Sequence, residues 1–457
     1  MQIRYVVMGF LLFLLLGLRF FFYYTSLPVF QNGQTVHLIG MVQNQPKLQG
    51  DSQKLTLISQ GNTFFITTKQ DPQYWYAEKL TVQGTIRAYT HGQQRLLSLS
   101  YPAISINTQQ NPLAKFSEYI REKVSETYTF SLDNDMKGLL IGMVFGIQQN
   151  MSTRFLQALQ TSGVMHVIAA SGMNITFIAG LLLGISQTFS HRRFALAFTL
   201  LGIIFYTALA GFQPSIVRAA IMGGLTLVAG LTGRQSYSLL GLFAAAIGML
   251  FFNPGWLFDI GFQLSFTATA GLFFVKPLID RGLSRVVKKD NILLADLSTT
   301  TAAQISTLPI LMANFGYYNP FSIVINLLVL WIVPFVMLIG SLAAILTFIF
   351  LPLAQVTVYV VYPLLWYFKT VVLWGSNIPS VWQVNEFPLT LTLGYYCVIV
   401  GLILMLRKRG NNWKNQESRI KNQESRIKNQ ESRIKNQESR IKNQESRIKN
   451  QELRIKN

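Results

Sequence analysis

Long apolar runs separated by short polar connections make up most of the chain, from Leu11 to Met405. A run of about 18 or more apolar residues with few charges is typical of a helix that crosses a bilayer. The pattern therefore predicts a polytopic α-helical membrane protein with about ten transmembrane helices. After a first helix within residues 1–28, the predicted spans are 163–186, 194–212, 215–231, 237–252, 257–275, 293–312, 321–351, 355–372 and 389–406.

Two apolar segments differ from a simple membrane span: the first helix and residues 321–351. Residues 5–24 exceed the apolar core of a typical signal peptide, and no Ala-x-Ala-like cleavage site follows them. We therefore expect an uncleaved helix, in which Arg19 reaches the membrane interface. Residues 321–351 are too long for a simple span and contain Pro334. This favours a half-crossing segment before a full helix.

Residues 29–110 change to an alternating pattern with frequent turn signals. Candidate strands are 35–42, 53–59, 63–68, 78–88 and 95–100. Short strands at this spacing favour a small all-β barrel of the OB type, with an unspecified β-sandwich as the alternative. OB barrels often bind single strands through aromatic and basic side chains. The candidate DNA contacts are Arg87, Arg95, Trp75 and Tyr76, although Trp75 could instead fill the barrel core.

Residues 111–162 predict connecting helices rather than spans. The segment 116–130 mixes charged and apolar residues, which indicates an interfacial helix. Residues 136–147 are apolar but too short to cross a bilayer alone. The Gln-rich segment 148–162 predicts a further surface or gating helix. The polytopic bundle then occupies residues 163–409.

The orientation of the chain follows from its basic clusters. If Met1 is cytoplasmic, the β domain lies outside the cytoplasm. The clusters 191–193, Arg234, 281–289 and 407–409 then all fall on the cytoplasmic side, provided that 321–351 crosses once. This agreement supports about ten crossings of a bacterial cytoplasmic membrane, with a cytoplasmic tail.

Composition agrees with the membrane class. Half of the residues are hydrophobic and 13% are charged, whereas a soluble chain has about 25% charged residues. The net charge of +20 comes partly from the loops and partly from the tail at 410–457, which repeats Lys-Asn-Gln-Glu-Ser-Arg-Ile. One apolar residue per repeat is too few for a coiled coil. We expect no function for the tail, with a tether to anionic lipid or DNA as the alternative.

Several expected signals of chemistry are missing from the sequence. It has no Gly-x4-Gly-Lys-Ser/Thr loop, so no ATP site is predicted. Its four histidines are not at metal-ligand spacing, so neither a zinc site nor another cofactor is predicted. Cys397 is the one cysteine, which excludes an intramolecular disulfide.

Polar groups within predicted spans are the candidate functional residues, because such groups usually face a bundle interior or a watery path. His166, Ser171, Gly172 and Asn174 lie in one span. On a continuous helix His166 and Asn174 would lie within about 80° of each other, while Ser171 would point elsewhere. This geometry disfavours a hydrolytic His–Ser dyad. Lining of a path and simple helix packing remain as alternatives.

Two charged residues, Arg218 and Asp259, lie just inside later spans. A structural ion pair between them would satisfy both, and contact of Arg218 with a phosphate is the alternative. Neutral polar groups in the same spans complete the candidate path or polar core of the bundle; they are Gln263, Gln304 and Asn326.

These segments together resemble the ComEC family, the inner-membrane DNA channel of bacterial natural competence. Residues 166–174 resemble its His-Leu-x-Ala-x-Ser-Gly-x-His segment, and residues 211–220 its Ser-Pro-x-x-Arg-Ala element. Residues 253–266 are similar to its Asp-Pro…Asp-x-Gly-Phe-Gln-Leu-Ser-Phe element. Residues 303–326 are similar to its Gln-x-x-Thr-Leu-Pro…His-Phe-Gly…Asn-Leu region. With the β domain, the resemblance covers about residues 1–406.

The resemblance implies a channel, not an enzyme, that passes single-stranded DNA into the cytoplasm during natural transformation. It also implies partners: a separate DNA receptor, a nuclease and an ATP-driven translocase. Asn174 stands where the family usually has a second His, and we expect no metallo-β-lactamase-like domain after residue 409. An intramembrane hydrolase or a lipid or small-solute transporter is the alternative, because a fold does not fix a function.

Overall fold

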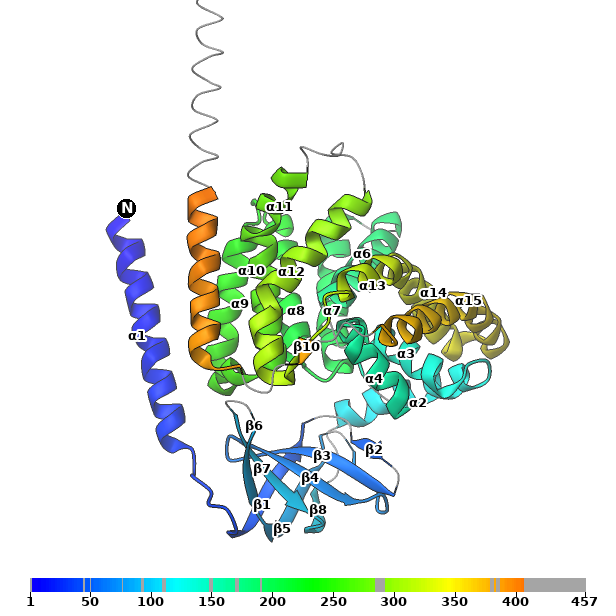
Figure 1. The fold of residues 1–457 in the computed structure, drawn as a ribbon. Helices are drawn as coiled ribbons and strands as arrows, with labels where there is room; N and C mark the ends of the chain where they lie inside the picture. Colours follow the sequence, from blue (N-terminus) through cyan, green and yellow to red (C-terminus); the bar gives the residue numbers. More distant parts are fainter. Residues whose placement is uncertain are drawn as a thin grey trace, which may run out of the picture. The chain divides into compact units, whose positions relative to one another are not determined.

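The computed structural model describes residues 2–43, 46–49, 51–75, 77–91, 94–108, 112–147, 151–168, 172–189, 191–283, 292–378, 382–383 and 387–406. Figure 1 shows its helices and strands. Within these residues, five helices are long and apolar enough to cross a membrane. A sixth span results if the bent pair Ile260–Phe274 and Lys276–Gly282 counts as one. These helices fit a membrane protein, and the number of about ten spans stays a prediction.

The β domain is a mixed sheet. The alternation along β1, Thr35–Val42, buries every second residue, so that Leu38 packs opposite Val82 in the core. The other strands are β2 (Lys47–Gln49), β3 (Ser52–Ser59), β4 (Asn62–Lys69), β5 (Lys79–Thr85), β6 (Arg87–His91), β7 (Gln94–Ser100) and β8 (Ala103–Thr108).

The pairing of the strands follows a nearly closed path. β1 pairs with β3, β3 with β4, and β7 with β6, all antiparallel, whereas β4 and β7 are parallel. β5 pairs with β1, and only Ile86 separates β5 from β6. The predicted strands are confirmed, except that 78–88 is two strands. Two strands were not predicted, β2 and β8, which pair with β3 and β5.

The predicted first helix is α1, Gln2–Ser26, whose last turn contacts both the β domain and a later helix. Tyr23 donates a hydrogen bond to the carbonyl of Gly61, and Tyr24 donates one to that of Pro254. Arg19 donates from Nε to the carbonyl of Phe251 at 3.2 Å. This contact satisfies the one charged group in the apolar part of α1.

The connecting helices form where the sequence predicts them. They are α2 (Pro112–Thr129), α3 (Asn134–Phe145) and α4 (Thr153–Thr161). α3 has twelve residues and is buried from Met136 to Phe145. Its sides contact α2, α5, α14 and α15, so its apolar surface is covered by protein on all sides.

The predicted span 163–186 contains two described helical stretches, α5 (Met165–Ile168) and α6 (Gly172–Phe189). Residues 169–171 between them lie outside the described residues. The following helices agree with the predicted spans: α7 (Arg192–Leu209), α8 (Pro214–Leu231), α9 (Ser238–Phe252), η1 (Pro254–Phe258), α10 (Ile260–Phe274), α11 (Lys276–Leu283) and α12 (Ile292–Phe315).

The later helices pack around α3. α13 (Ser322–Val329) continues through a 3₁₀ turn, η2 (Leu330–Ile332), into α14 (Val333–Ile349). Together they form one candidate span, Ser322–Ile349, with the 3₁₀ turn just before Pro334. α14 lies beside α15, Leu351–Ser376 (Figure 1). A short antiparallel sheet pairs β9 (Tyr317–Tyr318) with β10 (Trp382–Gln383).

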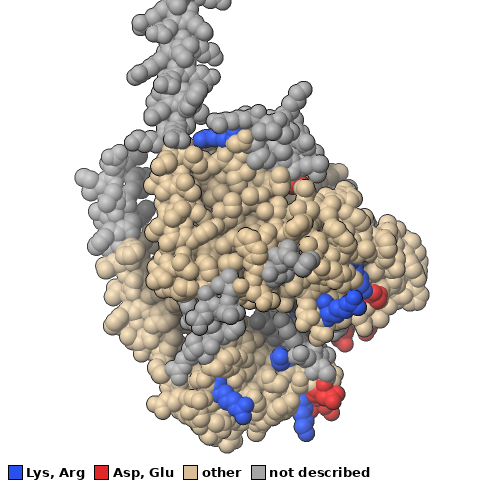
Figure 2. Space-filling model, viewed as in Figure 1, with Lys and Arg blue, Asp and Glu red and all other residues tan. Residues whose placement is uncertain are grey.

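The last helix, Leu389–Leu406, is apolar throughout, and the tail 410–457 lies outside the described residues. Over the other helices the visible face is almost free of charged side chains (Figure 2). Many large apolar side chains of the helices are exposed, including Phe335, Ile345 and Trp366, each at least half exposed. Such a surface is typical of helices that face lipid.

Candidate functional site

Arg218 is held in the interior of the bundle by α10. Its Nη1 donates hydrogen bonds to the carbonyl of Ser265 and to the hydroxyl of Thr269. The guanidinium lies 5.9 Å from the ring centre of Phe266, which is a favourable position for a cation. Arg218 is 9% exposed, and its Nε is buried without a hydrogen-bond partner among the described residues.

Asp259 has a different role from the one that the sequence predicts. Its Oδ1 accepts a hydrogen bond of 2.8 Å from the backbone N–H of Phe262, so it caps the N-terminus of α10. Among the described residues, no ion pair joins Asp259 to Arg218. The predicted pair is therefore wrong: the N-terminus of α10 binds Asp259, and Ser265 and Thr269 accept hydrogen bonds from Arg218.

Gly172 brings the start of α6 against Arg218. A Cβ placed on Gly172 would lie 2.9 Å from Nη2 of Arg218 and 3.4 Å from Cβ of Ala219. Only glycine allows this approach without a shift of the guanidinium. Gly172 and Arg218, which were predicted as separate candidates, are thus neighbours.

Asn174 is fully buried and bonds to the C-terminal end of α3. Its Nδ2 donates to the carbonyl of Met143 and to the hydroxyl of Tyr206, both at 3.0 Å. Tyr206 in turn donates to the carbonyl of Val144 at 2.9 Å. The last carbonyls of a helix have no partner within the helix, so these bonds satisfy groups that would otherwise be costly to bury.

The end of α3 is completed by two more contacts. Gly146 adopts φ 74°, a left-handed conformation that favours glycine, and its N–H bonds to the carbonyl of Gly142. Gln213 donates from Nε2 to the carbonyl of Gly146 at 3.3 Å. The sequence did not predict the role of Tyr206 or Gln213, because only the fold brings α7 and α8 to α3.

The structure does not bring His166 and Asn174 together on one helix face. His166 is exposed, and its Nδ1 lies 3.2 Å from the carbonyl of Gly163. Asn174 belongs to the next helix and is buried. The angle of about 80° between them stays a prediction, because residues 169–171 lie outside the described residues. Ser171 lies outside the described residues.

The neutral candidates have separate partners. Gln263 donates to the carbonyl of Leu257 at 2.9 Å. Gln304 donates to the hydroxyl of Ser322 at 2.8 Å and accepts a bond from Tyr318. Asn326 is 2% exposed, and its Oδ1 has no hydrogen-bond partner among the described residues. Gln304 and Asn326 lie on the contacting helices α12 and α13.

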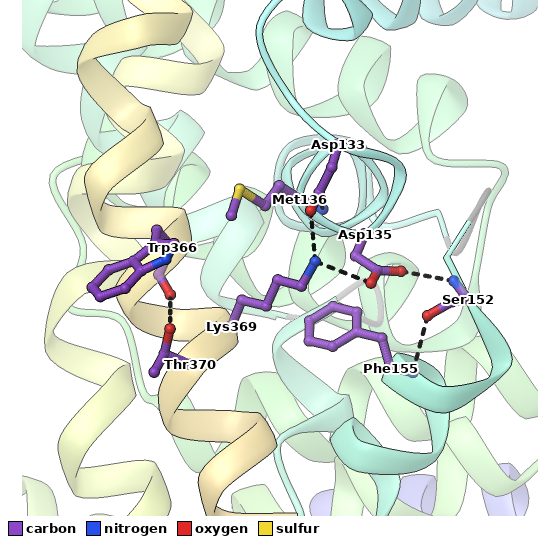
Figure 3. A network of polar contacts seen from close by, with 8 residues as sticks. All are labelled: Asp133, Asp135, Met136, Ser152, Phe155, Trp366, Lys369 and Thr370. Atoms are coloured by element: carbon purple, nitrogen blue, oxygen red, sulfur yellow. Dashed lines mark hydrogen bonds and ion pairs between the residues drawn. The ribbon is translucent and has the colours of Figure 1, made fainter.

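The sequence did not predict a charged network at the N-termini of α3 and α4. Figure 3 shows Lys369 of α15 reaching toward Asp133 and Asp135. Its Nζ lies 2.6 Å and 3.1 Å from their carboxylate oxygens. Asp133 also caps α3, through the N–H of Met136. Asp residues just before an apolar helix predict such a cap, but nothing in the sequence indicates the partner 236 residues away.

Besides the contact with Lys369, hydrogen bonds from Ser152 stabilise the ionised carboxylate of Asp135. Burial alone would raise the pKa of its carboxyl, but the bonds from Ser152 and the charge of Lys369 hold that pKa below its ordinary value. The N–H of Ser152 donates to Asp135 at 2.8 Å, and the hydroxyl of Ser152 caps α4. The network therefore joins α3, α4 and α15.

The candidate contacts of the β domain lie partly outside the described residues. Arg87 is exposed on β6. Trp75 is half-buried, and its backbone N–H donates to the carboxylate of Glu78 at 2.9 Å. Burial raises the pKa of the Glu78 carboxyl. Tyr76 is not described, and of Arg95 only the backbone in β7 is described. Within the described residues, no three His, Cys, Asp or Glu side chains gather as metal ligands.

The helical part of the chain matches a known protein family. Residues 143–409 match the family described as Competence protein, over more than half of the chain. The chain belongs to this family. All candidate residues of the bundle, from His166 to Asn326, lie within the matched part of this competence protein, whereas the β domain lies before it.

Two relatives of this competence protein extend the comparison. ComE operon protein 3 of Bacillus subtilis is 28% identical over 302 residues, which is 65% of this chain and 37% of the relative. Recombination protein 2 of Haemophilus influenzae is 26% identical over 205 residues, which is 43% of this chain and 23% of the relative. The matched part thus spans well under half of each relative. No solved structure matches the chain.

Proposed function

We propose that this competence protein is a membrane channel that passes single-stranded DNA into the cytoplasm during natural transformation. The match of residues 143–409 to the Competence protein family carries the proposal. The ComEC-like motifs lie in the same part of the chain, on α5 to α13. The apolar helices supply a scaffold for a path through a bilayer.

The path is proposed to run along the polar groups of the bundle. His166 is exposed, and Gln304 is partly exposed and bonds to the hydroxyls of Ser322 and Tyr318, so both can contact water or a polar chain. Asn326 has a buried oxygen without a described partner. Asn174, by contrast, has its amide committed to α3, which favours a packing role. Asp259 and Gln263 are likewise bonded to nearby backbone.

The β domain is proposed to be an OB-like barrel outside the cytoplasm that receives the strand. The nearly closed path β1–β3–β4–β7–β6/β5–β1, with one parallel pair between β4 and β7, supports a Greek-key barrel. Exposed Arg87 on β6 offers a cation to the DNA backbone. Arg95, Trp75 and Tyr76 remain proposed contacts.

The proposed setting is the bacterial cytoplasmic membrane, with about ten crossings and a cytoplasmic N-terminus and tail. The lipid bilayer and single-stranded DNA are the direct partners. A DNA receptor, a nuclease and an ATP-driven translocase are proposed as separate proteins. For the translocase, the support is that the sequence contains no Gly-x4-Gly-Lys-Ser/Thr loop to bind ATP.

A clean deletion tests the proposal. Cells that lack the chain should still bind labelled double-stranded DNA at the surface but should not accumulate label in the cytoplasm. A plasmid copy of the intact chain should restore entry, and this is the control for effects on neighbouring genes. Normal cytoplasmic entry in the deletion strain would exclude the channel function, and loss of surface binding alone would indicate a receptor instead.

A further inference from the structure

Three neighbouring strands of the β domain meet at one edge of the sheet. β4 lies between β3 and β7, antiparallel to the first and parallel to the second (Figure 1). The register pairs Lys69, at the end of β4, with Ser52, at the start of β3. It also pairs Thr67 with Ser100, so Tyr101 follows β7 beside the same end of β4. The sheet therefore gathers side chains that are far apart in the sequence.

A cavity of about 690 Å³ opens at this edge. Ligand pockets in proteins have volumes of about 300 to 1,000 Å³, so the cavity has room for one nucleotide. Most of the residues around it are exposed, and Tyr101 is 62% exposed, so a ligand can reach them. The described residues that line the cavity are Asp51, Ser52, Lys69, Gln70, Asp71 and Tyr101.

Gln53 holds one wall of the cavity from inside the domain. This side chain is fully buried, and its Nε2 donates to the carbonyls of Lys69, Gln70 and Pro72 at 2.7, 3.2 and 2.6 Å. Its Oε1 accepts a hydrogen bond of 3.2 Å from the N–H of Tyr74. A buried amide bonded in this way fixes the segment that it contacts. The wall is therefore in place before any ligand arrives, which lowers the cost of binding.

Tyr101 is the one aromatic residue among the described residues that line the cavity. Its φ is 50°, in the left-handed region that few residues other than glycine adopt. Its N–H donates to the carbonyl of Thr67 at 2.7 Å, which anchors the backbone to β4 while the side chain stays exposed. An exposed aromatic ring is a surface on which an unpaired base stacks.

The charges of the cavity suit a base better than a phosphate. Its described lining has two carboxylates, Asp51 and Asp71, and one ammonium group, Lys69, so a lone anion would be repelled. A carboxylate accepts hydrogen bonds from the exocyclic amino group of cytosine, whereas thymine has a carbonyl at that position. The ammonium group of Lys69 is available to the phosphate next to such a base.

We propose that this cavity binds one unpaired base of the incoming strand, stacked on Tyr101, with its amino group donating to Asp51 or Asp71. The inference rests on the proposed function, which brings a single strand to the β domain, and it adds a preference for cytosine over thymine. A base within a duplex has its amino group in a base pair and its faces in the stack. The cavity therefore selects unpaired strands.

Two homopolymers test the base preference. The full chain in nanodiscs of phosphatidylcholine is titrated with a fluorescent oligodeoxycytidylate and, separately, with an oligothymidylate of equal length. Wild type should bind the cytosine strand about tenfold more tightly, as one specific base contact provides. The double variant Asp51→Ala/Asp71→Ala should bring this ratio close to one. Removal of two negative charges strengthens the binding of both strands alike, so the ratio is the decisive measurement.

Tyr101→Gly removes the ring without opposing the fold, because glycine readily adopts a φ of 50°. It should weaken binding of the cytosine strand by about fivefold or more. Tyr101→Phe keeps the ring and should bind as wild type does. Tyr89→Ala is the matched control, since Tyr89 is an exposed tyrosine on β6 of the same domain and is not among the residues that line the cavity. It should leave the cytosine preference unchanged.

Several results would overturn the cavity or its ligand. Equal binding of the two strands by wild type, or a ratio that the double variant leaves unchanged, would overturn base recognition and favour a cationic segment of a partner protein. Wild-type affinity in Tyr101→Gly would exclude stacking on the ring.

Two further results separate the ligand and the function. Free deoxycytidine monophosphate should bind more weakly than the strand, and equal affinity would assign the cavity to free nucleotides instead. Strand binding without a base preference would overturn only the cavity, whereas normal entry of DNA into cells that lack the chain would overturn the channel function.

Discussion

Replacement of Asn174 by alanine should destabilise the bundle without directly blocking a path for DNA. The side chain is fully buried, and its amide donates to Met143 and Tyr206 at 3.0 Å. Each lost hydrogen bond removes about 1 kcal/mol, and a buried acceptor left without a donor costs a further 1 to 3 kcal/mol or so. The expected loss in the free energy of unfolding for Asn174→Ala is about 3 to 5 kcal/mol.

Tyr206→Phe removes the other half of the same contact. Its hydroxyl donates to Val144 at 2.9 Å and accepts from Asn174. A loss of about 1 to 3 kcal/mol is expected. Because the two single variants share one hydrogen bond, the double variant should lose less than their sum, by about 1 kcal/mol.

The assay is unfolding of the purified full chain in mixed micelles, with labelled-DNA entry measured in parallel at matched protein levels. Thr176→Ala is the control, since Thr176 is exposed near Asn174 on α6 and, among the described residues, bonds only to the carbonyl of Gly172. It should change stability by less than about 0.5 kcal/mol. Wild-type stability of Asn174→Ala, together with lost DNA entry, would refute the packing role and place Asn174 on the path.

The remaining predictions concern the β domain, the charged network, the topology and the tail. The raised pKa of Glu78 means that the native state binds its proton more tightly than the unfolded state, so stability falls as pH rises from the ordinary value of 4.5 through the native pKa. Glu78→Gln should remove this fall, measured by amide hydrogen exchange in β1 and β5 of the full chain at several pH values; an identical fall in the variant would exclude Glu78 as its source. Lys369→Met should destabilise the contact of α3 with α15 by about 1 to 3 kcal/mol, between the values for exposed and buried ion pairs, and Lys369→Arg should retain most of it. Unfolding in mixed micelles measures this, and equal losses for Met and Arg would indicate packing rather than charge. A reporter after Tyr101 should lie outside the cytoplasm and one after Arg193 inside, and the same side for both would contradict the assigned spans. Truncation after Arg409 should leave insertion and DNA entry unchanged, and a large loss of transformation would show a function of the tail.

The sequence predicted the elements whose pattern is local. Alternation identified the strands from Thr35 to Ser100, because one buried face repeats every second residue. Hydrophobicity likewise identified the long helices. It missed β2, which is only three residues long, and β8, which starts just after Pro102.

Contacts between distant residues could not be predicted from one sequence. The order of Arg218 and Asp259 along the chain says nothing of the distance between them, and the fold gives each a nearer backbone partner. The partners of Asn174 and Lys369 lie on helices that only tertiary packing brings near. The sequence therefore indicated which polar groups need a partner, but not which partner each one finds.

The short helix α3 has a consequence for the order in which the protein is made. It is too short to cross a bilayer and is apolar from Gly138 to Phe145, so it is poorly soluble on either side of the membrane. The carbonyls at its C-terminal end bind side chains of α6 and α7, and Asp133 at its N-terminal end pairs with Lys369 of α15. All three partner helices follow α3 in the sequence. During synthesis, α3 thus stays without its final surroundings until most of the spans have been inserted. Completion of the bundle is therefore a late event that depends on the last helices to leave the ribosome.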